Sequence, residues 1–301
     1  YTYHMIPYNQ QPINTIEVEG KVIQVFSIEG GNIDEKTVTS FGEEWTKFSA
    51  FDEEEIRIAG DQYFDIIPDE YLRGKSVLDV GCGTGRWMRY VAKKAKHVDG
   101  IDPSIAVYSA AKLLKDLPNV RISRAGVDNI PFGDESFDLV FSLGVLHHIP
   151  DTAKAMQDSV KKLKKGGYFL VYLYYSLDNR GMLFKFLFFL SNLLRNIISK
   201  LPSGLKKIVC DILAVLFYIP FVFVTRIFKR IGLRRFIKYI PLSYYADKSF
   251  NIIKNDSLDR FGTPLEQRFS REEIRRMMQA AGLSNIEFSG ATGIDLLCDE
   301  G

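Results

Sequence analysis

Cysteine is scarce in this chain, and the few that occur lie far apart. The 301 residues include only Cys82, Cys210 and Cys298. An odd number of cysteines without a repeated short spacing excludes a disulfide framework and a zinc site, and we expect no bound metal. This usage is typical of a reducing compartment, so we expect a cytoplasmic protein.

Long apolar runs are also missing. Residues 212–224 are uniformly apolar, but they number thirteen and Pro220 interrupts them. Residues 182–198 carry a narrow polar stripe along an otherwise apolar helical pattern. Because a membrane-spanning helix needs about 20 apolar residues, neither run predicts a transmembrane segment. The first residues show no secretory signal.

Charge of the two signs is unevenly distributed. Between Arg180 and Tyr239 there are twelve lysines and arginines but only one acid, so this segment carries +11 and the rest of the chain −9. A basic, very apolar segment is typical of helices in a membrane interface, a lid over a greasy substrate, or a contact with a second subunit. A packed helical cap with a solvated basic face is the remaining alternative. Nucleic acid is not expected as a partner, because Phe, Leu and Ile are interleaved with the basic residues.

One short motif says more about function than the rest of the chain. Residues 77–85 read Val-Leu-Asp-Val-Gly-Cys-Gly-Thr-Gly. The pattern predicts a buried strand that ends in a glycine turn and is followed by a helix over 84–96. Glycine lets the backbone approach a ligand closely, and the free N–H groups at the start of the helix point to the same space. The motif therefore predicts a site for a nucleotide-type cofactor.

Three details distinguish this site from a dinucleotide site. The glycines at every second position of 81–85 leave Arg86 where the third glycine of the dinucleotide fingerprint falls. Asp79 would repel a pyrophosphate, whereas it would attract a cationic amine and a sulfonium. Asp102 ends the next predicted strand, where a carboxylate accepts hydrogen bonds from ribose hydroxyls.

With these residues in view, segment 75–175 resembles the class I S-adenosylmethionine-dependent methyltransferases, especially the group that contains the ubiquinone and menaquinone C-methyltransferases. The resemblance implies methyltransferase activity, S-adenosyl-L-methionine as the cofactor and S-adenosyl-L-homocysteine as its product. Four further landmarks follow in the family's order: Gly100-Ile-Asp-Pro-Ser104, Asn129-Ile-Pro-Phe132, Ser136-Phe-Asp-Leu-Val-Phe141 and Gly144-Val-Leu-His-His-Ile-Pro-Asp151.

Strands and helices alternate along the same segment. Predicted strands at 75–80, 97–102, 119–123, 137–142 and 167–175 are separated mostly by helical patterns, which predicts an α/β fold with a doubly wound parallel sheet. The resemblance implies a Rossmann-like sheet of seven strands with a helical insert after the fifth. Strands at 284–289 and 292–298 would then complete the sheet, the last one antiparallel.

The chain is therefore expected to have five parts. They are an N-terminal extension with a hairpin around Gly20 (1–36), an N-terminal helical cap (37–72), the cofactor-binding core (73–176), the basic hydrophobic insert (177–250), and an acceptor loop with the end of the sheet (251–301).

The resemblance assigns a set of residues to the cofactor. Asp79 holds the methionine amino group, and Asp102 binds the ribose hydroxyls. The family's usual acid near the adenine is replaced by Gly126, and an acid follows two residues later as Asp128. Trp45 lies over the cofactor or packs on the core. The full set is Trp45, Asp79, Gly81, Cys82, Gly83, Gly85, Asp102, Pro103, Ser104, Val127, Asp128 and Leu143.

Candidates for the acceptor side come from two other segments. His147 and His148 follow a strand at the edge where open α/β sheets bind ligands, and one of them is predicted to be a general base. Alternatively His147 packs beneath the site, because a carbon or amine acceptor needs no strong base. A polar group of the acceptor is predicted to contact five further residues: Tyr244, Tyr245, Arg260, Glu266 and Arg268. The alternative is that these residues belong to a surface loop held by ion pairs.

Three functions remain open. The first is methyl transfer to a hydrophobic or lipid-linked small molecule, with the protein peripheral at the membrane. The second is methylation of a soluble sugar or natural-product intermediate, with 180–240 as a lid or homodimer contact. The third is a cofactor-binding interaction protein that has no methyltransferase activity.

Overall fold

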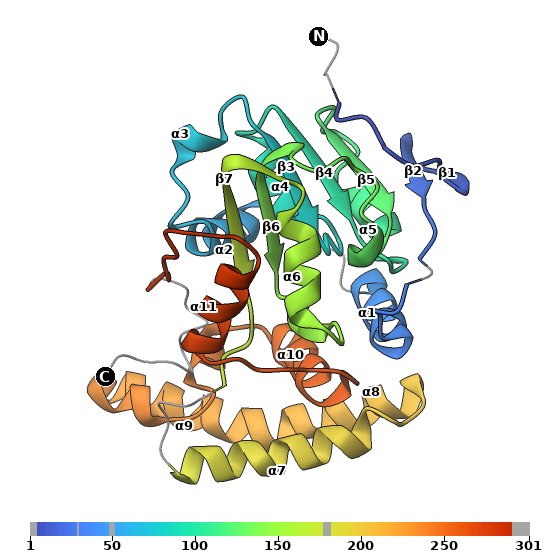
Figure 1. Cartoon of the computed structure of the whole chain (residues 1–301). Helices are drawn as coiled ribbons and strands as arrows, with labels where there is room; N and C mark the ends of the chain where they lie inside the picture. The colour runs from blue at the N-terminus through green and yellow to red at the C-terminus, as the bar shows by residue number, and fades with distance from the viewer. Residues whose placement is uncertain (1–4, 29, 48–51, 177–181, 291–301) are drawn as a thin grey trace. The chain divides into compact units, whose positions relative to one another are not determined.

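The computed structural model describes residues 5–28, 30–47, 52–176 and 182–290. The chain divides into two compact units (Figure 1). Unit 1 comprises residues 1–178 and 265–301, and unit 2 comprises residues 179–264. Unit 1 contains the sheet, and the described residues of unit 2 form helices and short connections.

Unit 1 is built on a seven-stranded sheet. The strand order is β1-β2-β5-β4-β3-β6-β7, and all neighbours are parallel except the β1-β2 hairpin. The five strands β3 to β7 confirm the predicted parallel α/β arrangement. The strands are β1 (Asn14–Val18), β2 (Lys21–Val25), β3 (Ser76–Val80), β4 (His97–Ile101), β5 (Val120–Arg124), β6 (Phe137–Leu143) and β7 (Leu163–Tyr172).

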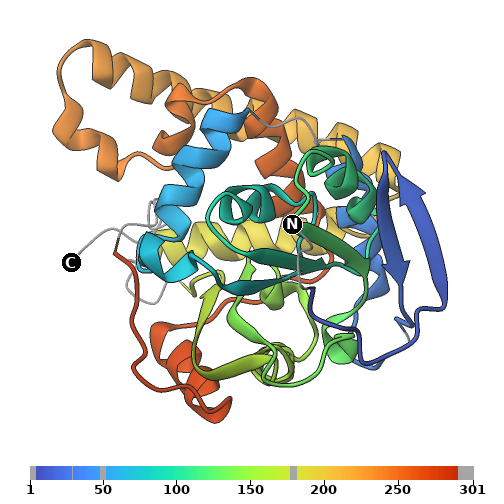
Figure 2. The same ribbon diagram turned by 90° about the horizontal axis from the view of Figure 1, so that it is seen from above.

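The N-terminal hairpin supplies the two additional strands. It turns at Glu19 and Gly20, whose φ angles of 52° and 78° match the twist of the flanking strands. Strand β2 then pairs in parallel with β5 (Figure 2). The sequence predicts the hairpin but not its place in the sheet, because strand pairing over a hundred residues leaves no local signal.

The prediction of a strand over 284–289 is wrong. Among the described residues that segment pairs with no strand, and its apolar side chains pack toward the helix that precedes it. Ile286 is partly buried and packs against the core cluster that contains Met278, and the Phe288 ring is 4.9 Å from the guanidinium of Arg271. The other predicted strand, 292–298, lies outside the described residues.

Helices cover both faces of the sheet. Val77 and Val98 belong to the core shared with α2, α4 and α5, whereas Leu78 and Val140 belong to the core shared with α6 and α11. Because successive residues of a strand enter different cores, β3 and β4 are buried at every position. The helices of unit 1 are α1 (Glu35–Lys47), α2 (Glu53–Tyr63), α3 (Asp69–Leu72), α4 (Arg86–Ala92), α5 (Ala106–Leu113), η1 (Val127–Asn129), η2 (Leu146–His148), α6 (Thr152–Val160) and α11 (Arg271–Ala280).

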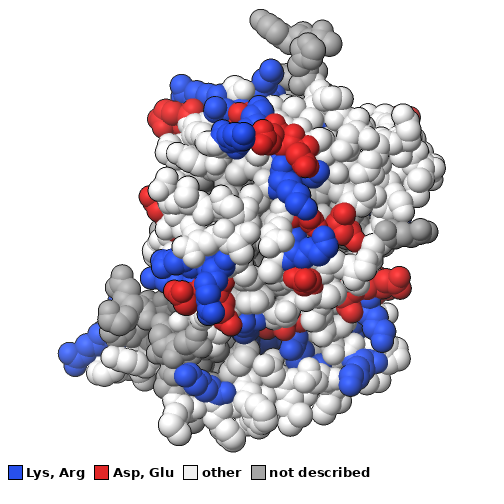
Figure 3. Space-filling view, in the orientation of Figure 1, with Lys and Arg blue, Asp and Glu red and all other residues white. Residues whose placement is uncertain are grey.

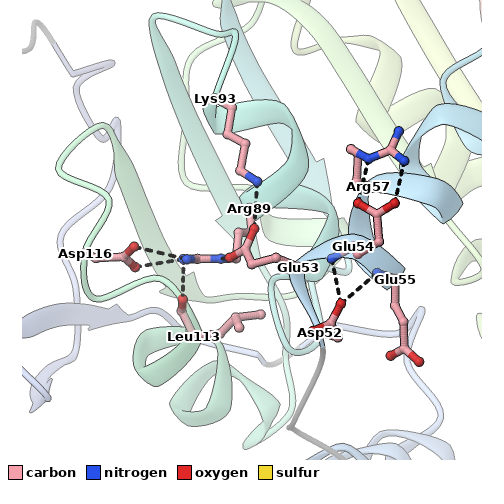
Figure 4. A network of polar contacts seen from close by, with 9 residues as sticks. All are labelled: Asp52, Glu53, Glu54, Glu55, Arg57, Arg89, Lys93, Leu113 and Asp116. Atoms are coloured by element: carbon pink, nitrogen blue, oxygen red, sulfur yellow. Dashed lines mark hydrogen bonds and ion pairs between the residues drawn. The ribbon is translucent and has the colours of Figure 1, made fainter.

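An ionic network fastens α2 to α4 and α5 (Figure 4). Arg89 of α4 pairs with Glu53 at the start of α2, and it also donates hydrogen bonds to the Asp116 carboxylate at 2.7 Å and the Leu113 carbonyl at 2.8 Å. Asp52 caps α2 by accepting from backbone N–H groups of its first turn. The network therefore fixes the start of α2 on the cofactor-binding core.

Unit 2 has a small core of its own. Helix α10 packs against α7 and α8, and Ile253 of α10 meets Cys210, Ala214 and Tyr218 in that core. The insert predicted at 177–250 is therefore shorter than this unit, which also includes α10. Its helices are α7 (Met182–Ile198), α8 (Ser203–Leu213), η3 (Ala214–Tyr218), α9 (Ile219–Arg230), η4 (Arg234–Tyr239), η5 (Ser243–Asp247) and α10 (Phe250–Gly262).

The segments α8, η3 and α9 form one continuous helix of 28 residues, Ser203–Arg230. Pro220 therefore does not interrupt it as expected. Residues 214–218 form a π turn just before the proline, and such a turn accommodates a ring that would otherwise collide with a carbonyl of the preceding turn. Among the described residues, this is the helix that is long and apolar enough to cross a membrane.

Candidate active site

The glycine turn after β3 has the geometry that a close ligand requires. Gly81, Gly83 and Gly85 have φ angles of +84°, +50° and +79°, which only glycine adopts readily. A Cβ at position 81 would lie 2.4 Å from a methyl group of Val145, so the turn lies directly against the segment after β6. A Cβ at position 83 would meet nothing within 4 Å, so the turn is open on that side.

Asp79, near the end of β3 just before the glycines, is a buried carboxylate, one oxygen of which lacks a hydrogen-bond partner among the described residues. The side chain is 1% exposed, and the oxygen without a described partner is Oδ2. Burial, followed by the negative charge of Asp102, raises the pKa of Asp79 well above its usual range, and Arg86 opposes this shift. A cationic amine would supply both the missing charge and the missing donors. The site therefore fits an ammonium-bearing ligand.

Asp102 holds the glycine turn in place. Its Oδ2 accepts a hydrogen bond from the Gly83 N–H at 2.9 Å, and its Oδ1 accepts from the N–H and the hydroxyl of Ser104 at 2.8 and 2.6 Å. A carboxylate accepts about four hydrogen bonds, so Asp102 has capacity for about one more. Burial, and then the two nearby carboxylates, raise the pKa of the Cys82 thiol well above its usual range, which leaves this thiol protonated and unreactive.

A second carboxylate without partners lies after β5. Both carboxylate oxygens of Asp128, in η1, are buried and lack a hydrogen-bond partner among the described residues. Its neighbour Val127 is buried, and Leu143 at the end of β6 is 8% exposed. Pro103 accepts a hydrogen bond from Arg124 through its carbonyl at 3.0 Å. The sheet order brings the carboxyl ends of β3, β4, β5 and β6 to one edge, and these predicted residues lie along it.

Helix α1 lies against the same edge. A Cβ at Gly42 would be 3.3 Å from the Ser104 side chain, so the helix backbone approaches the start of α5 closely. The guanidinium of Arg86 lies 5.3 Å from the ring of Trp45 on α1 and 4.4 Å from the ring of Trp87 on α4. This cation–π arrangement links the helical cap to the glycine turn. From the sequence, Arg86 shows only that the third glycine of the dinucleotide fingerprint is missing, and no contact is predicted for it.

The two histidines differ in what they can do. Neither ring nitrogen of His147 has a partner among the described residues, and burial, together with His148 and Arg268, lowers the pKa of His147 well below its usual value. The Nδ1 of His148 lies 2.7 Å from the Leu265 carbonyl oxygen. Because a carbonyl only accepts, Nδ1 carries the proton, and in the neutral ring Nε2 carries the lone pair. His148 is therefore the residue of the pair that is oriented as a base.

Aromatic rings surround the histidine pair. The His147 ring centroid lies 3.9 Å from that of Tyr174, just past the end of β7, and the His148 ring lies 4.8 Å from Phe41 of α1. Sequence reasoning missed Tyr174 and Phe41. The position of Tyr174 was available, because it follows a strand whose carboxyl end lies at the same edge as those of β3 and β6.

Residues 265–269 lie across this pair. The Gln267 N–H donates to the His147 carbonyl at 2.9 Å, and its side-chain amide donates to the Ile149 carbonyl at 2.7 Å. Phe269 pairs with the backbone beyond β7, because its N–H donates to the Tyr174 carbonyl at 2.9 Å. The predicted acceptor loop is thus anchored beside the histidines.

Glu266 and Arg268 form an ion pair in this loop. The Arg268 Nε to Glu266 Oε1 distance is 2.9 Å, and the two side chains are only 14% and 4% exposed. The Arg268 guanidinium also lies 5.0 Å from the Tyr174 ring. The structure therefore brings two of the five predicted acceptor residues next to both histidines.

The other three predicted acceptor residues belong to unit 2. Tyr245 is partly buried beside that unit's core, with its ring 5.4 Å from Tyr218. Tyr244 is 44% exposed and lies near Lys248. Arg260 lies on α10, 5.9 Å from the Phe188 ring. Tyr245 therefore has a structural role within unit 2. The described residues contain no cluster of three or more His, Cys, Asp or Glu that could hold a metal ion.

Fold and site together define a domain of the doubly wound α/β class, with a buried carboxylate beside its glycine turn that is unpartnered on one oxygen among the described residues. Residues 78–171 match the family model described as a methyltransferase domain. This part of the chain is therefore similar to methyltransferase domains, as the sequence resemblance implies.

Relatives match the same part of the chain. A tRNA U34 carboxymethyltransferase of Desulfotalea psychrophila is 36% identical over 105 residues, which are 34% of this chain and 32% of the relative. A phthiotriol/phenolphthiotriol dimycocerosates methyltransferase of Mycobacterium tuberculosis is 34% identical over 100 residues, or 33% and 37% of the two chains. The chain thus covers about a third of the length of these relatives.

Among solved structures, the YcgJ protein of Bacillus subtilis is 28% identical, with a TM-score of 0.39. The match covers 45% of this chain and 58% of that protein.

Proposed function

We propose that this protein transfers the methyl group of S-adenosylmethionine to a small-molecule acceptor that is hydrophobic or lipid-linked. The observation that carries the proposal is Asp79, a buried carboxylate oxygen without a partner beside an open glycine turn. The methyltransferase domain over 78–171 supports it. The ubiquinone-type resemblance motivates the acceptor class, and the apolar surface of unit 2 is consistent with it.

The residues at the carboxyl edge of the sheet suit the chemical parts of this cofactor. Asp79 would hold the ammonium group, and the backbone of the glycine turn would face the methionine and ribose. Asp102 has capacity for about one ribose hydroxyl. Asp128 would accept the adenine amino group, which would satisfy its orphaned carboxylate oxygens. The bound cofactor supplies an electrophilic methyl group on a sulfonium.

The residues around His147 and His148 would orient the nucleophilic atom of the methyl acceptor and receive its proton. If the nucleophile is a hydroxyl, its oxygen would take the methyl group as the methyl–sulfur bond breaks and the neutral thioether leaves. The hydroxyl proton would pass to Nε2 of His148, whose opposite nitrogen donates to the Leu265 carbonyl. Tyr174 and Phe41 would form an apolar wall, and the Glu266–Arg268 ion pair would contact a polar part of the acceptor. Positioning of this kind contributes much of the acceleration in a displacement reaction.

Two competing acceptor classes remain to be tested against this proposal. A soluble sugar or natural-product intermediate would make unit 2 a lid or a dimer contact. The Desulfotalea psychrophila relative is named for tRNA, so tRNA is a third acceptor to include. A protein that binds the cofactor but methylates nothing would be the interaction protein of the third hypothesis.

The test is to incubate the full chain and methyl-labelled S-adenosylmethionine with whole-cell extract, separate membranes, soluble small molecules and RNA, and count the label in each. We expect label in the organic extract of the membranes. His148→Gln is expected to lower that transfer while retaining cofactor binding. Label confined to the aqueous small molecules or to RNA, or no transfer at all, would contradict the proposal.

A further inference from the structure

Unit 2 exposes far more large apolar side chains than unit 1. Among the described residues, twenty-five such side chains lie within 182–252 and only six lie in unit 1. Phe189 and Phe223 are each 63% exposed, and Leu216 is 62% exposed. Single exposed apolar residues are ordinary, but contiguous ones mark an interaction surface.

The exposed residues form continuous stripes along the two longest helices of unit 2. On the helix Ser203–Arg230 one face is buried in the unit's core through Cys210, Ala214 and Tyr218. The opposite face exposes an apolar residue every three or four positions, so the stripe follows the helical period. Its members include Ile208, Ile212, Val215, Ile219, Phe223 and Ile227. Helix α7 exposes a similar stripe that includes Phe186, Phe189, Leu193 and Ile197.

Basic residues flank these stripes. No charged residue occurs between Asp211 and Arg226, whereas Arg230 ends the long helix, Arg234 and Arg235 follow it, and all three are exposed. Unit 2 has fifteen lysines and arginines against four acids, a net charge of +11. In Figure 3 the surface over α7 and the long helix is largely uncharged, and the lysines and arginines seen there lie toward its ends.

The charge decides between two occupants of this surface. A second copy of the chain would bring two basic units together around a shared apolar patch, and like charges across an interface oppose association. An anionic phospholipid bilayer offers acyl chains to the apolar stripes and negative headgroups to the arginines around them. The combination therefore fits a bilayer better than a copy of itself.

The long helix is also tied to the rest of unit 2 by polar contacts. The Tyr218 hydroxyl donates to Asp256 at 2.5 Å, and the Ser257 hydroxyl donates to the Cys210 carbonyl at 2.7 Å. Asp211 forms an ion pair with Lys254 at 2.8 Å. A spanning orientation would carry these groups into hydrocarbon or break their contacts. The helix is therefore suited to lie in the interface rather than to cross it.

We propose that unit 2 docks the protein on anionic phospholipid bilayers, with α7 and the helix Ser203–Arg230 lying in the interface plane. This inference deepens the proposed function and rests on it only for the presence of a membrane-borne acceptor. Docking would keep the methyltransferase domain at the surface where such an acceptor is found.

The test is co-sedimentation of the full chain with vesicles of phosphatidylcholine alone or with equal parts of phosphatidylglycerol. We expect stronger binding to the phosphatidylglycerol vesicles, on the order of tenfold, and weaker binding as salt is raised. The double variant Phe189→Glu/Phe223→Glu should lose binding. Its matched control, Ile13→Glu/Ile58→Glu, adds the same charge at exposed apolar positions of unit 1 and should bind normally.

The basic residues are tested in the same way. Arg234→Glu/Arg235→Glu should remove the preference for phosphatidylglycerol, whereas Lys96→Glu/Lys165→Glu in unit 1 should keep it. Equal binding to both vesicles, or equal losses in test and control variants, would overturn the proposal. So would a solution dimer that Phe189→Glu/Phe223→Glu converts to monomer, or a protein that alkaline carbonate fails to release from membranes.

Vesicle binding and methyl transfer can fail separately. Asp79→Asn should bind vesicles like the wild type although it loses the cofactor. A chain that docks on vesicles but methylates nothing upholds the docking surface and contradicts the proposed function.

Discussion

The two units of this chain differ in which groups they leave unsatisfied. Unit 1 buries its apolar residues in two cores but leaves buried polar atoms of Asp79, Asp128 and His147 without partners among the described residues. Unit 2 pairs Asp256 with Tyr218 and has a buried Oδ1 of Asn255 without a partner among the described residues, but most of its unsatisfied surface is the long exposed apolar stripes. These groups motivate the two proposals made above, a cationic ligand for unit 1 and an anionic membrane surface for unit 2.

The largest expected effect is the loss of stability when a buried phenylalanine of unit 1 is replaced by alanine, compared with an exposed phenylalanine of unit 2. Phe141 in β6 is fully buried, with its ring 5.2 Å from Phe64, whereas Phe223 is 63% exposed. Phe141→Ala should lower the free energy of unfolding by about 3–5 kcal/mol. Phe223→Ala should change it by less than about 0.5 kcal/mol. Urea unfolding measures both, and similar losses in the two variants would mean that the stripe of unit 2 is packed rather than exposed.

The second effect is a pH dependence that arises in unit 1. The pKa of His147 is lowered by burial, so below its usual value of about 6.5 the unfolded chain takes up a proton that the folded chain does not. Stability that is present above that pH is therefore lost as the pH falls, by up to about 1.4 kcal/mol per unit. His147→Phe keeps the packing on Tyr174 and should flatten the dependence. An unchanged slope between pH 7 and 5 in thermal unfolding would refute this role.

The third prediction is that replacing a buried aspartate by asparagine changes protein stability in opposite directions in the two units. Because the pKa of Asp79 is raised, its contribution to stability is present at acid pH and lost as pH rises, so the charged form is a burden at neutral pH. Without cofactor, Asp79→Asn should stabilise the protein by about 1 kcal/mol at neutral pH. Asp256→Asn weakens the hydrogen bond from Tyr218 and should destabilise it by about as much. Thermal unfolding of both variants at pH 7 measures the two changes in stability. A loss of stability in both variants would contradict the predicted difference between the units.

The smallest effect concerns the ionic network of α2. Glu53 is 49% exposed, so Glu53→Gln should lower the free energy of unfolding by no more than about 1 kcal/mol, and the loss should shrink in high salt. Glu70→Gln, at an exposed site outside this network, is the control. A loss that persists at high salt would show that Glu53 acts through more than its charge.

The sequence predicted the parts of the fold that depend on local pattern. The strand, glycine turn and acid of 77–85 are contiguous, and Asp102 follows the next strand, so their juxtaposition follows from parallel strands meeting at one edge. The parallel pairing of β2 with β5 and the packing of 283–288 on α11 depend on distant partners, which no local pattern records. The continuous helix through Pro220 depends on a π turn, which hydropathy does not indicate.

The residues predicted to contact the methyl acceptor show the same limit of prediction from local sequence pattern. His147 and His148 were candidates because of their place after β6, but only the bond from His148 to Leu265 distinguishes them. Arg86, Tyr174 and Phe41 had no motif, and their proximity to the site comes from helix and loop packing. Tyr245 was predicted from its place in the chain before the acceptor loop, whereas its contacts are with Tyr218 in unit 2.

Equilibrium binding of S-adenosylmethionine to the full chain tests the central claim most directly, because the claim is that Asp79 at the glycine turn holds the cofactor's amine. The account predicts saturable binding by the wild type, a loss of about a hundredfold or more in Asp79→Asn, and no comparable binding of a nicotinamide dinucleotide. Undiminished binding by Asp79→Asn, or preference for the dinucleotide, would contradict it.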